Sequence, residues 1–195
     1  LNMFNPKKNL AYKDCEVATY LAYKDGEVAG RLAVIIQKLY NAKVNEKRVR
    51  FTRFDCINDV NVAKALFDAG EKWAKEKGME VIHGPLGFND LDCEGLIVEG
   101  FDKRCTFEER YNYDYYKDLI EACGYRKETD WIERRIYPPK ERNERVDRIA
   151  DIVAKRYNLK FATAKNKNEF IKKYKDGILD VLDKAYSPLY GVVPY

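Results

Sequence analysis

The segment from Gly84 to Tyr116 carries the side chains best suited to chemistry in this chain. Its acids include Asp90, Asp92, Glu94 and Glu99, and its tyrosines are Tyr111, Tyr113, Tyr115 and Tyr116. A carboxylate can accept a proton from an amine, and a tyrosine hydroxyl can donate one to a leaving thiolate. We therefore predict that Asp90, Glu94, Tyr113 and Tyr116 are catalytic. The alternative is a structured surface loop whose tyrosines pack against a sheet edge.

Other nucleophiles and metal ligands are poorly represented. Cys93 and Cys105 are possible nucleophiles, but the chain has a single histidine, His83, to activate them. His83 follows an apolar run, so we expect it in the core. Five cysteines without a C-x-x-C pair argue against a zinc site and against a disulfide framework, and they favour a reducing cytoplasm.

The composition limits the partners that we expect. The net charge is +4, from 36 basic and 32 acidic side chains, which does not indicate nucleic-acid binding. No apolar run reaches the ~18 residues of a membrane span, and no signal peptide is visible. We expect a small-molecule substrate, no nucleic acid, no membrane partner and a cytoplasmic location.

Local patterns predict the elements that precede this segment. Asp25-Gly26 suits a tight hairpin turn between two strands. Asn58 or Asp59 can cap a helix, and Gly78 can end it. The predicted elements are strands Val17–Tyr23, Val28–Ile36, Arg48–Phe54 and Met79–His83, and helix Asn61–Lys77.

This order of elements predicts an α/β fold with a mixed sheet. We expect Val28–Ile36 and Arg48–Phe54 to be antiparallel neighbours. Met79–His83 should run parallel to Arg48–Phe54, because a helix in a right-handed crossover joins them.

The C-terminal part follows Pro138-Pro139. Apolar spacing predicts a helix over Arg142–Tyr157, a strand over Leu159–Ala164 and a second helix over about Asn168–Ala185. We therefore divide the chain into a core, residues 1–140, and a helix–strand–helix extension, residues 141–195.

Three segments, in their order along the chain, resemble parts of the GNAT superfamily of N-acetyltransferases. KDGEVAGRLAVI resembles the family's second and third strands, AKALFDAGEKWAKEKGMEVI its long helix and fifth strand, and YYKDLIEACGY its last helix. The whole chain also resembles an uncharacterised bacterial GNAT-like branch through its GPLGF, VEGF and PLYGVVP segments. The resemblance implies a GNAT-like mixed sheet flanked by helices, and transfer of an acetyl or acyl group from acyl-CoA to an amine.

The resemblance also bears on domain organisation. Residues 1–140 would be a GNAT-like core without an evident first strand and first helices. Residues 141–195 would either begin a second GNAT-like unit or complete the first sheet in permuted fashion. We therefore expect a homo-oligomer or a missing second GNAT half as the partner of this chain.

The resemblance implies where acetyl-CoA would bind. The family holds the CoA pyrophosphate on a glycine-bearing loop at the start of the long helix, where backbone N–H groups face the anion. The matching region here implies Cys56, Asn58, Asn61 and Val62 as the cofactor-binding residues.

Two departures from the family pattern define a second function. The loop has no glycine, and Asp59 would place a negative charge beside the phosphate, unless Asp59 is a plain helix cap. Ile120 stands where the family often has a tyrosine acid. The alternative to an acyltransferase is a catalytically degenerate GNAT-like module that binds a ligand or a partner.

Overall fold

The computed structural model describes residues 2–106 and 109–194. The chain forms two units. Unit 1 holds the residues up to Asp130 together with those from Ala185 onward, and unit 2 is Trp131–Lys184.

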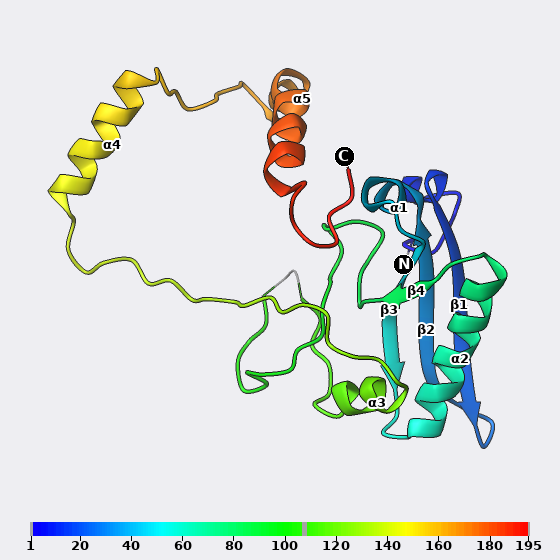
Figure 1. The fold of residues 1–195 in the computed structure, drawn as a ribbon. Helices are drawn as coiled ribbons and strands as arrows, with labels where there is room; N and C mark the ends of the chain where they lie inside the picture. The colour runs from blue at the N-terminus through cyan, green and yellow to red at the C-terminus, as the bar shows by residue number, and fades with distance from the viewer. Residues whose placement is uncertain (1, 107–108, 195) are drawn as a thin grey trace. The chain divides into compact units, whose positions relative to one another are not determined.

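Unit 1 is built on a four-stranded mixed sheet in the order β1-β2-β3-β4 (Figure 1). Strands β1 and β2 are antiparallel, as are β2 and β3, whereas β3 and β4 are parallel. This confirms the predicted pairing of the strands. The hairpin turn is also as predicted, because Asp25 and Gly26 have φ angles of 53° and 85°. The strands are β1 Cys15–Lys24, β2 Glu27–Gln37, β3 Arg48–Cys56 and β4 Val81–His83.

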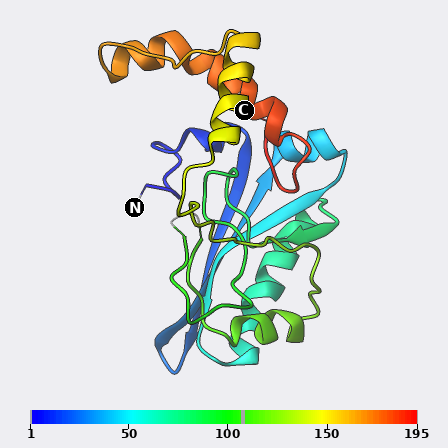
Figure 2. The same ribbon diagram turned by 90° about the vertical axis from the view of Figure 1, so that its left-hand side faces the viewer.

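Helix α2 (Val60–Glu76) covers one face of the sheet (Figure 1). The Asp59 side chain accepts a hydrogen bond from the Asn61 N–H and caps the helix, and Gly78 follows its end with a φ angle of 71°. Buried residues of α2 pack against β2 and β3 in the main hydrophobic core. Helix α3 (Tyr116–Ala122) lies beside the N-terminal end of α2 (Figures 1 and 2).

The other face of the sheet is covered by segments that sequence reasoning left without structure. A short 3-10 helix, η1 (Leu10–Lys13), precedes β1, and helix α1 (Lys38–Val44) follows β2 directly. The Phe88 side chain is buried against Cys15 and Ile35, and its ring lies 5.4 Å from that of Tyr12. This second, smaller core fixes the chain that follows β4 onto the sheet.

A β-bulge in β3 changes which side chains face the core. Arg31 pairs with Asp55 but Ala33 pairs with Thr52, so β3 carries one extra residue at this point. Arg53 takes the positive φ angle of 52° that the bulge requires. As a result Phe51 and Phe54 both face the core beneath α2, while Thr52 and Asp55 line a pocket.

Unit 2 consists of helix α4 (Glu144–Arg156), the connections around it, and helix α5 (Lys167–Tyr186), which ends just beyond the unit boundary. Both predicted helices are confirmed. The predicted strand Leu159–Ala164 is wrong: this stretch contains no regular element. A strand is stabilised by a neighbour, and no segment pairs with this stretch in the described chain. No described helix has the length and apolar character needed to cross a membrane.

Candidate functional site

The sheet opens between β3 and β4, and a pocket lies at this opening. Strand β4 pairs with β3 only as far as His83 opposite Arg50, and the last backbone bond runs from the Leu86 N–H to the Phe51 carbonyl, at 2.8 Å. Beyond Phe51 the edge of β3 has no strand partner in the described chain. A pocket of about 40 Å³ occupies this edge, lined by Thr52, Arg53, Phe54, Asp55, Pro85, Cys93, Gly95, Leu96, Arg110, Tyr111, Asn112 and Tyr116.

Two tyrosines of the predicted cluster bind the free end of β3. The Cys56 N–H donates to the Tyr116 hydroxyl oxygen at 3.3 Å, and the Tyr115 hydroxyl donates to the Cys56 carbonyl at 3.0 Å. These bonds replace the ladder bonds that a fifth strand would make, so they satisfy buried backbone groups. Tyr115 and Tyr116 therefore hold the free end of β3, and Tyr116 also lines the pocket.

Tyr116 also contacts a carboxylate inside the pocket. Its hydroxyl donates to Asp55 Oδ1 at 3.2 Å. Asp55 is paired with Arg31, whose Nε lies 2.6 Å from Oδ2, and with Arg110 at 3.8 Å. Burial raises the pKa of Tyr116 to about 12, so its hydroxyl keeps its proton at neutral pH. The pocket thus combines a proton donor with a carboxylate whose side chain is 38% exposed.

Asn112 fixes the loop that closes the pocket. It is buried, and its side chain bonds both the N–H and the carbonyl of Ile97, at 2.8 and 3.1 Å. The Asn112 side-chain amide also donates a hydrogen bond to the Tyr113 carbonyl at 2.8 Å. Asn112 therefore ties the two arms of the long connection together beside Tyr116.

The other predicted catalytic residues lie outside this pocket. The Tyr113 side chain is 61% exposed, and its ring stacks on Tyr115 at 5.2 Å. Glu94 lies between two lining residues but does not line the pocket itself. Its carboxylate and Asp90 are close enough to interact, and burial raises the pKa of Glu94 to about 7. The structure thus brings Asp90 and Glu94 together, and places Tyr116 in a different environment.

Glu94 instead belongs to a buried cluster around Arg50. Glu94 Oε1 lies 3.9 Å from Arg50 Nη1. The Arg50 side chain is 1% exposed, stacks over Tyr40 at 4.6 Å, and donates to the carbonyls of Gly87 at 3.2 Å and Gly191 at 2.5 Å. One guanidinium therefore holds the connection after β4 and the C-terminal segment against the sheet.

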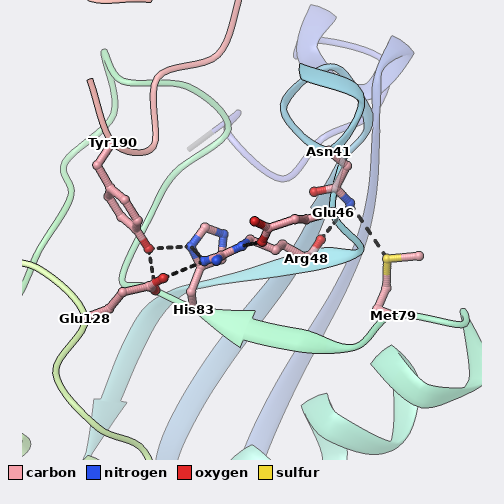
Figure 3. A network of polar contacts seen from close by, with 7 residues as sticks. All are labelled: Asn41, Glu46, Arg48, Met79, His83, Glu128 and Tyr190. Carbon is pink, nitrogen blue, oxygen red and sulfur yellow. Dashed lines mark hydrogen bonds and ion pairs between the residues drawn. The ribbon is translucent and has the colours of Figure 1, made fainter. Parts of the chain in front are cut away.

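A second polar network joins the two chain segments that flank unit 2 in sequence (Figure 3). The Tyr190 hydroxyl lies 2.6 Å from Glu128 Oε2 and 2.7 Å from His83 Nδ1, and Glu128 Oε1 pairs with Arg48 at 2.8 Å. Burial, followed by the charges of Arg50 and Arg48, lowers the pKa of His83 to about 3, so the ring is neutral at physiological pH. His83 is buried, as expected, and it supports the C-terminal segment.

The predicted cofactor residues do not form a phosphate cradle. Asn58 and Asn61 are exposed, Val62 is buried in the core, and the backbone of Cys56 is bound by tyrosines. Asp59 is paired with Lys24 at 2.6 Å, and this bond lowers the pKa of the carboxyl. A negative group therefore lies at the N-terminus of α2, where the family would place a phosphate.

Sequence reasoning missed the polar pocket residues that lie outside the tyrosine cluster, chiefly Asp55, Arg110 and Asn112. Asp55 sits within a strand, and only the bulge at Arg53 turns it toward the pocket. The alternation of RVRFTRFDC, which breaks after Thr52, is the one signal that pointed to it.

Two buried thiols are unsuited to nucleophilic chemistry, whereas Cys93, one of the two possible nucleophiles, lines the pocket. Burial raises the pKa of both Cys15 and Cys56 to about 11, which keeps these thiols protonated. No group of three or more histidine, cysteine or acidic side chains in the described part of the chain is arranged to hold a metal ion.

Two curated proteins are similar to this chain. It is 33% identical to Protein YghO of Escherichia coli strain K12 over 109 residues, which cover 54% of this chain and 28% of that protein. It is 29% identical to bacterial ceramide synthase of Caulobacter vibrioides over 127 residues, which cover 64% of this chain and 33% of that protein. The chain therefore spans about a third or less of the length of the curated relatives it matches.

The other comparisons give no match. No protein-family model matches the chain, and no solved structure matches it.

Proposed function

We propose that this chain takes part in N-acyl transfer from an acyl thioester, such as acetyl-CoA or a longer acyl-CoA, to an amine. The observation that carries the proposal is the pocket at the open edge of β3, where the Tyr116 hydroxyl lies 3.2 Å from Asp55 Oδ1. Similarity to a protein named bacterial ceramide synthase supports it, because a ceramide is the N-acyl derivative of a long-chain amino alcohol. We propose such a long-chain amine as the acceptor.

In the proposed reaction the amine nitrogen attacks the thioester carbonyl, the carbon–sulfur bond breaks, and an amide forms. Asp55 attracts the ammonium group of the acceptor, which first loses one proton to solvent to become a free amine. Asp55 then takes up the second proton, which the nitrogen loses when it attacks. Tyr116, which keeps its proton at neutral pH, donates it to the leaving thiolate. The hydrogen bond between the two side chains then returns a proton to the tyrosine. Glu94, the base predicted from the sequence, does not line this pocket and lies in the Arg50 cluster, so it has no part in this reaction scheme.

The test is an assay of the full chain with palmitoyl-CoA and sphinganine in mixed micelles, with mass spectrometry of the amide and measurement of released thiol. We expect amide formation that falls about 100-fold or more in Tyr116→Phe, within the usual range for an acid–base residue. Asp55→Asn should also be slow, whereas Asp25→Asn, in the hairpin turn, serves as the matched control. Equal rates in Tyr116→Phe and the unaltered chain would refute the assigned roles.

A second function, ligand binding without catalysis, is favoured by two observations. The pocket, at about 40 Å³ against roughly 300–1,000 Å³ for typical small-molecule sites, has room for one small group of a ligand but not for an acyl thioester and an amine together. The Lys24–Asp59 pair lies where a CoA phosphate would bind. In that case the chain would bind the amine and release no thiol, which the same assay detects when combined with calorimetry.

A further inference from the structure

Unit 2 exposes apolar side chains that a folded protein normally covers. Neither α4 nor α5 has a buried residue among those described. The exposed fraction reaches 88% for Ile136 and 99% for Phe161. Exposed apolar side chains that gather on one face mark a binding surface for a protein or a membrane. We therefore expect a binding partner to cover these side chains when the protein acts.

The charge of unit 2 indicates the chemistry of this binding partner. Residues 131–184 hold 15 Lys and Arg against nine Asp and Glu, a net charge of +6, while the whole chain carries +4. The remainder of the chain is therefore net acidic, at −2. The positive charge is concentrated on the unit with the exposed apolar side chains.

Helix α4 arranges these two properties on one surface. Val146, Ile149 and Val153 follow helical spacing and are exposed, and they form an apolar stripe. Helical geometry places Arg145 and Arg156 beside this stripe. The opposite side is polar and carries both signs of charge, from Glu144, Arg148, Asp151 and Lys155. Asp147 is paired with Arg142.

We propose that α4 of unit 2 lies in the surface of an anionic membrane, with the stripe Val146, Ile149 and Val153 inserted among the lipids. A helix with a well-defined apolar face, a charged opposite face and low overall hydrophobicity has this property. Anionic lipid attracts the basic side chains beside the stripe, and the mixed charged side of the helix faces water.

The membrane contact of α4 rests on the proposed function, which supplies the reason for it. A long-chain amine resides in membranes, so an enzyme that acylates it needs access to the lipid surface. The proposal departs from our expectation of no membrane partner, because the unpartnered apolar faces are visible only in the structure.

Vesicle co-sedimentation of the full chain tests the proposal without any acyl donor, so its failure is distinct from failure of acyl transfer. We expect binding to phosphatidylglycerol-containing vesicles, little binding to pure phosphatidylcholine, and weakening of binding by salt. Ile149→Glu combined with Val153→Glu should reduce the affinity by about tenfold or more, because it removes apolar insertion and adds repulsion. The matched control, Leu21→Glu combined with Val28→Glu, alters exposed apolar residues of unit 1 and should bind normally.

A second variant distinguishes loss of membrane binding from a loss of folding. Arg145→Glu combined with Arg156→Glu leaves the apolar stripe intact and should weaken binding to anionic vesicles alone. Absence of vesicle binding by the unaltered chain would overturn the proposal. So would sedimentation velocity showing a dimer that dissociates on Ile149→Glu/Val153→Glu, because the stripe would then contact a second copy.

Discussion

At the scale of single residues, the Tyr116 hydroxyl makes two hydrogen bonds that a substitution would remove. This hydroxyl accepts from the Cys56 N–H and donates to Asp55. Tyr116→Phe leaves that buried N–H unpaired, so we expect the free energy of unfolding to fall by about 1 to 2 kcal/mol. Tyr113→Phe, at an exposed ring, should change it by less than about 0.5 kcal/mol. Urea unfolding measures both, and equal losses would contradict the assigned contacts.

Asp59 allows a test of the cofactor region. Its carboxylate caps α2 and pairs with Lys24, and it should repel the phosphates of CoA. We expect calorimetry to show no saturation at micromolar CoA. Asp59→Asn keeps an effective helix cap but removes the charge, so CoA should bind more tightly to it. Tight binding by the unaltered chain would mean that phosphate binds elsewhere.

His83 and Glu94 should give opposite dependences of stability on pH. The pKa of His83 falls from 6.5 to about 3 on folding, so the unfolded chain binds the extra proton below pH 6.5 and stability decreases there. The pKa of Glu94 rises from 4.5 to about 7, so the folded chain binds the extra proton between those values and stability increases as pH falls. The two effects oppose each other near pH 5 to 6.5.

Two variants separate these contributions. In Glu94→Gln the free energy of unfolding should drop as pH falls from 6.5 to 5, by at most about 1.4 kcal/mol per pH unit. In His83→Gln it should drop less steeply over that range, or rise. The other carboxylates are common to both variants, so identical slopes in urea unfolding would show that these pKa shifts are absent.

At the scale of elements, Arg50 holds the C-terminal segment to the sheet. Its guanidinium contacts two carbonyls from distant segments and stacks on Tyr40, an arrangement that the point charge of lysine does not reproduce. Arg50→Lys should lower the free energy of unfolding by roughly 2 kcal/mol and speed hydrogen exchange in residues 187–194. Arg53→Lys is the control, because the Arg53 guanidinium donates only to the Met3 sulfur within the described part of the chain. Unchanged exchange in Arg50→Lys would show that Val192 and Val193 hold the segment without it.

Elements set by local signals were predictable from the sequence, and those set by distant contacts were not. The hairpin at Asp25-Gly26 and the capped helix α2 follow from turn chemistry and apolar spacing. The strand expected at Leu159–Ala164 required a partner that local sequence does not specify. Asp55 was missed for the same reason, because a bulge in the pairing of β2 and β3 directs it to the pocket. The residues of the candidate site are therefore known only once the strands are paired.

At the scale of the whole molecule, the two units differ in how their chain is protected. Unit 1 has a continuous core, whereas residues 131–143 form no helix or strand and expose Arg134, Arg135, Lys140 and Arg142. Limited trypsin digestion should therefore cut first within residues 131–143, since cleavage requires locally unfolded, accessible chain. Arg50, which is buried in β3, should be cut only after global unfolding.

The first cut should not release the C-terminal segment from unit 1. Tyr190 remains bonded to Glu128 and His83, Gly191 to Arg50, and the Val192 carbonyl to Lys43 at 2.8 Å. The two fragments should co-elute in size-exclusion chromatography and separate when Arg50→Lys or Tyr190→Phe weakens these contacts. Separation of the fragments from the unaltered chain directly after the first cut would mean that these contacts do not hold the segment, since only the covalent link through unit 2 would then keep it in place.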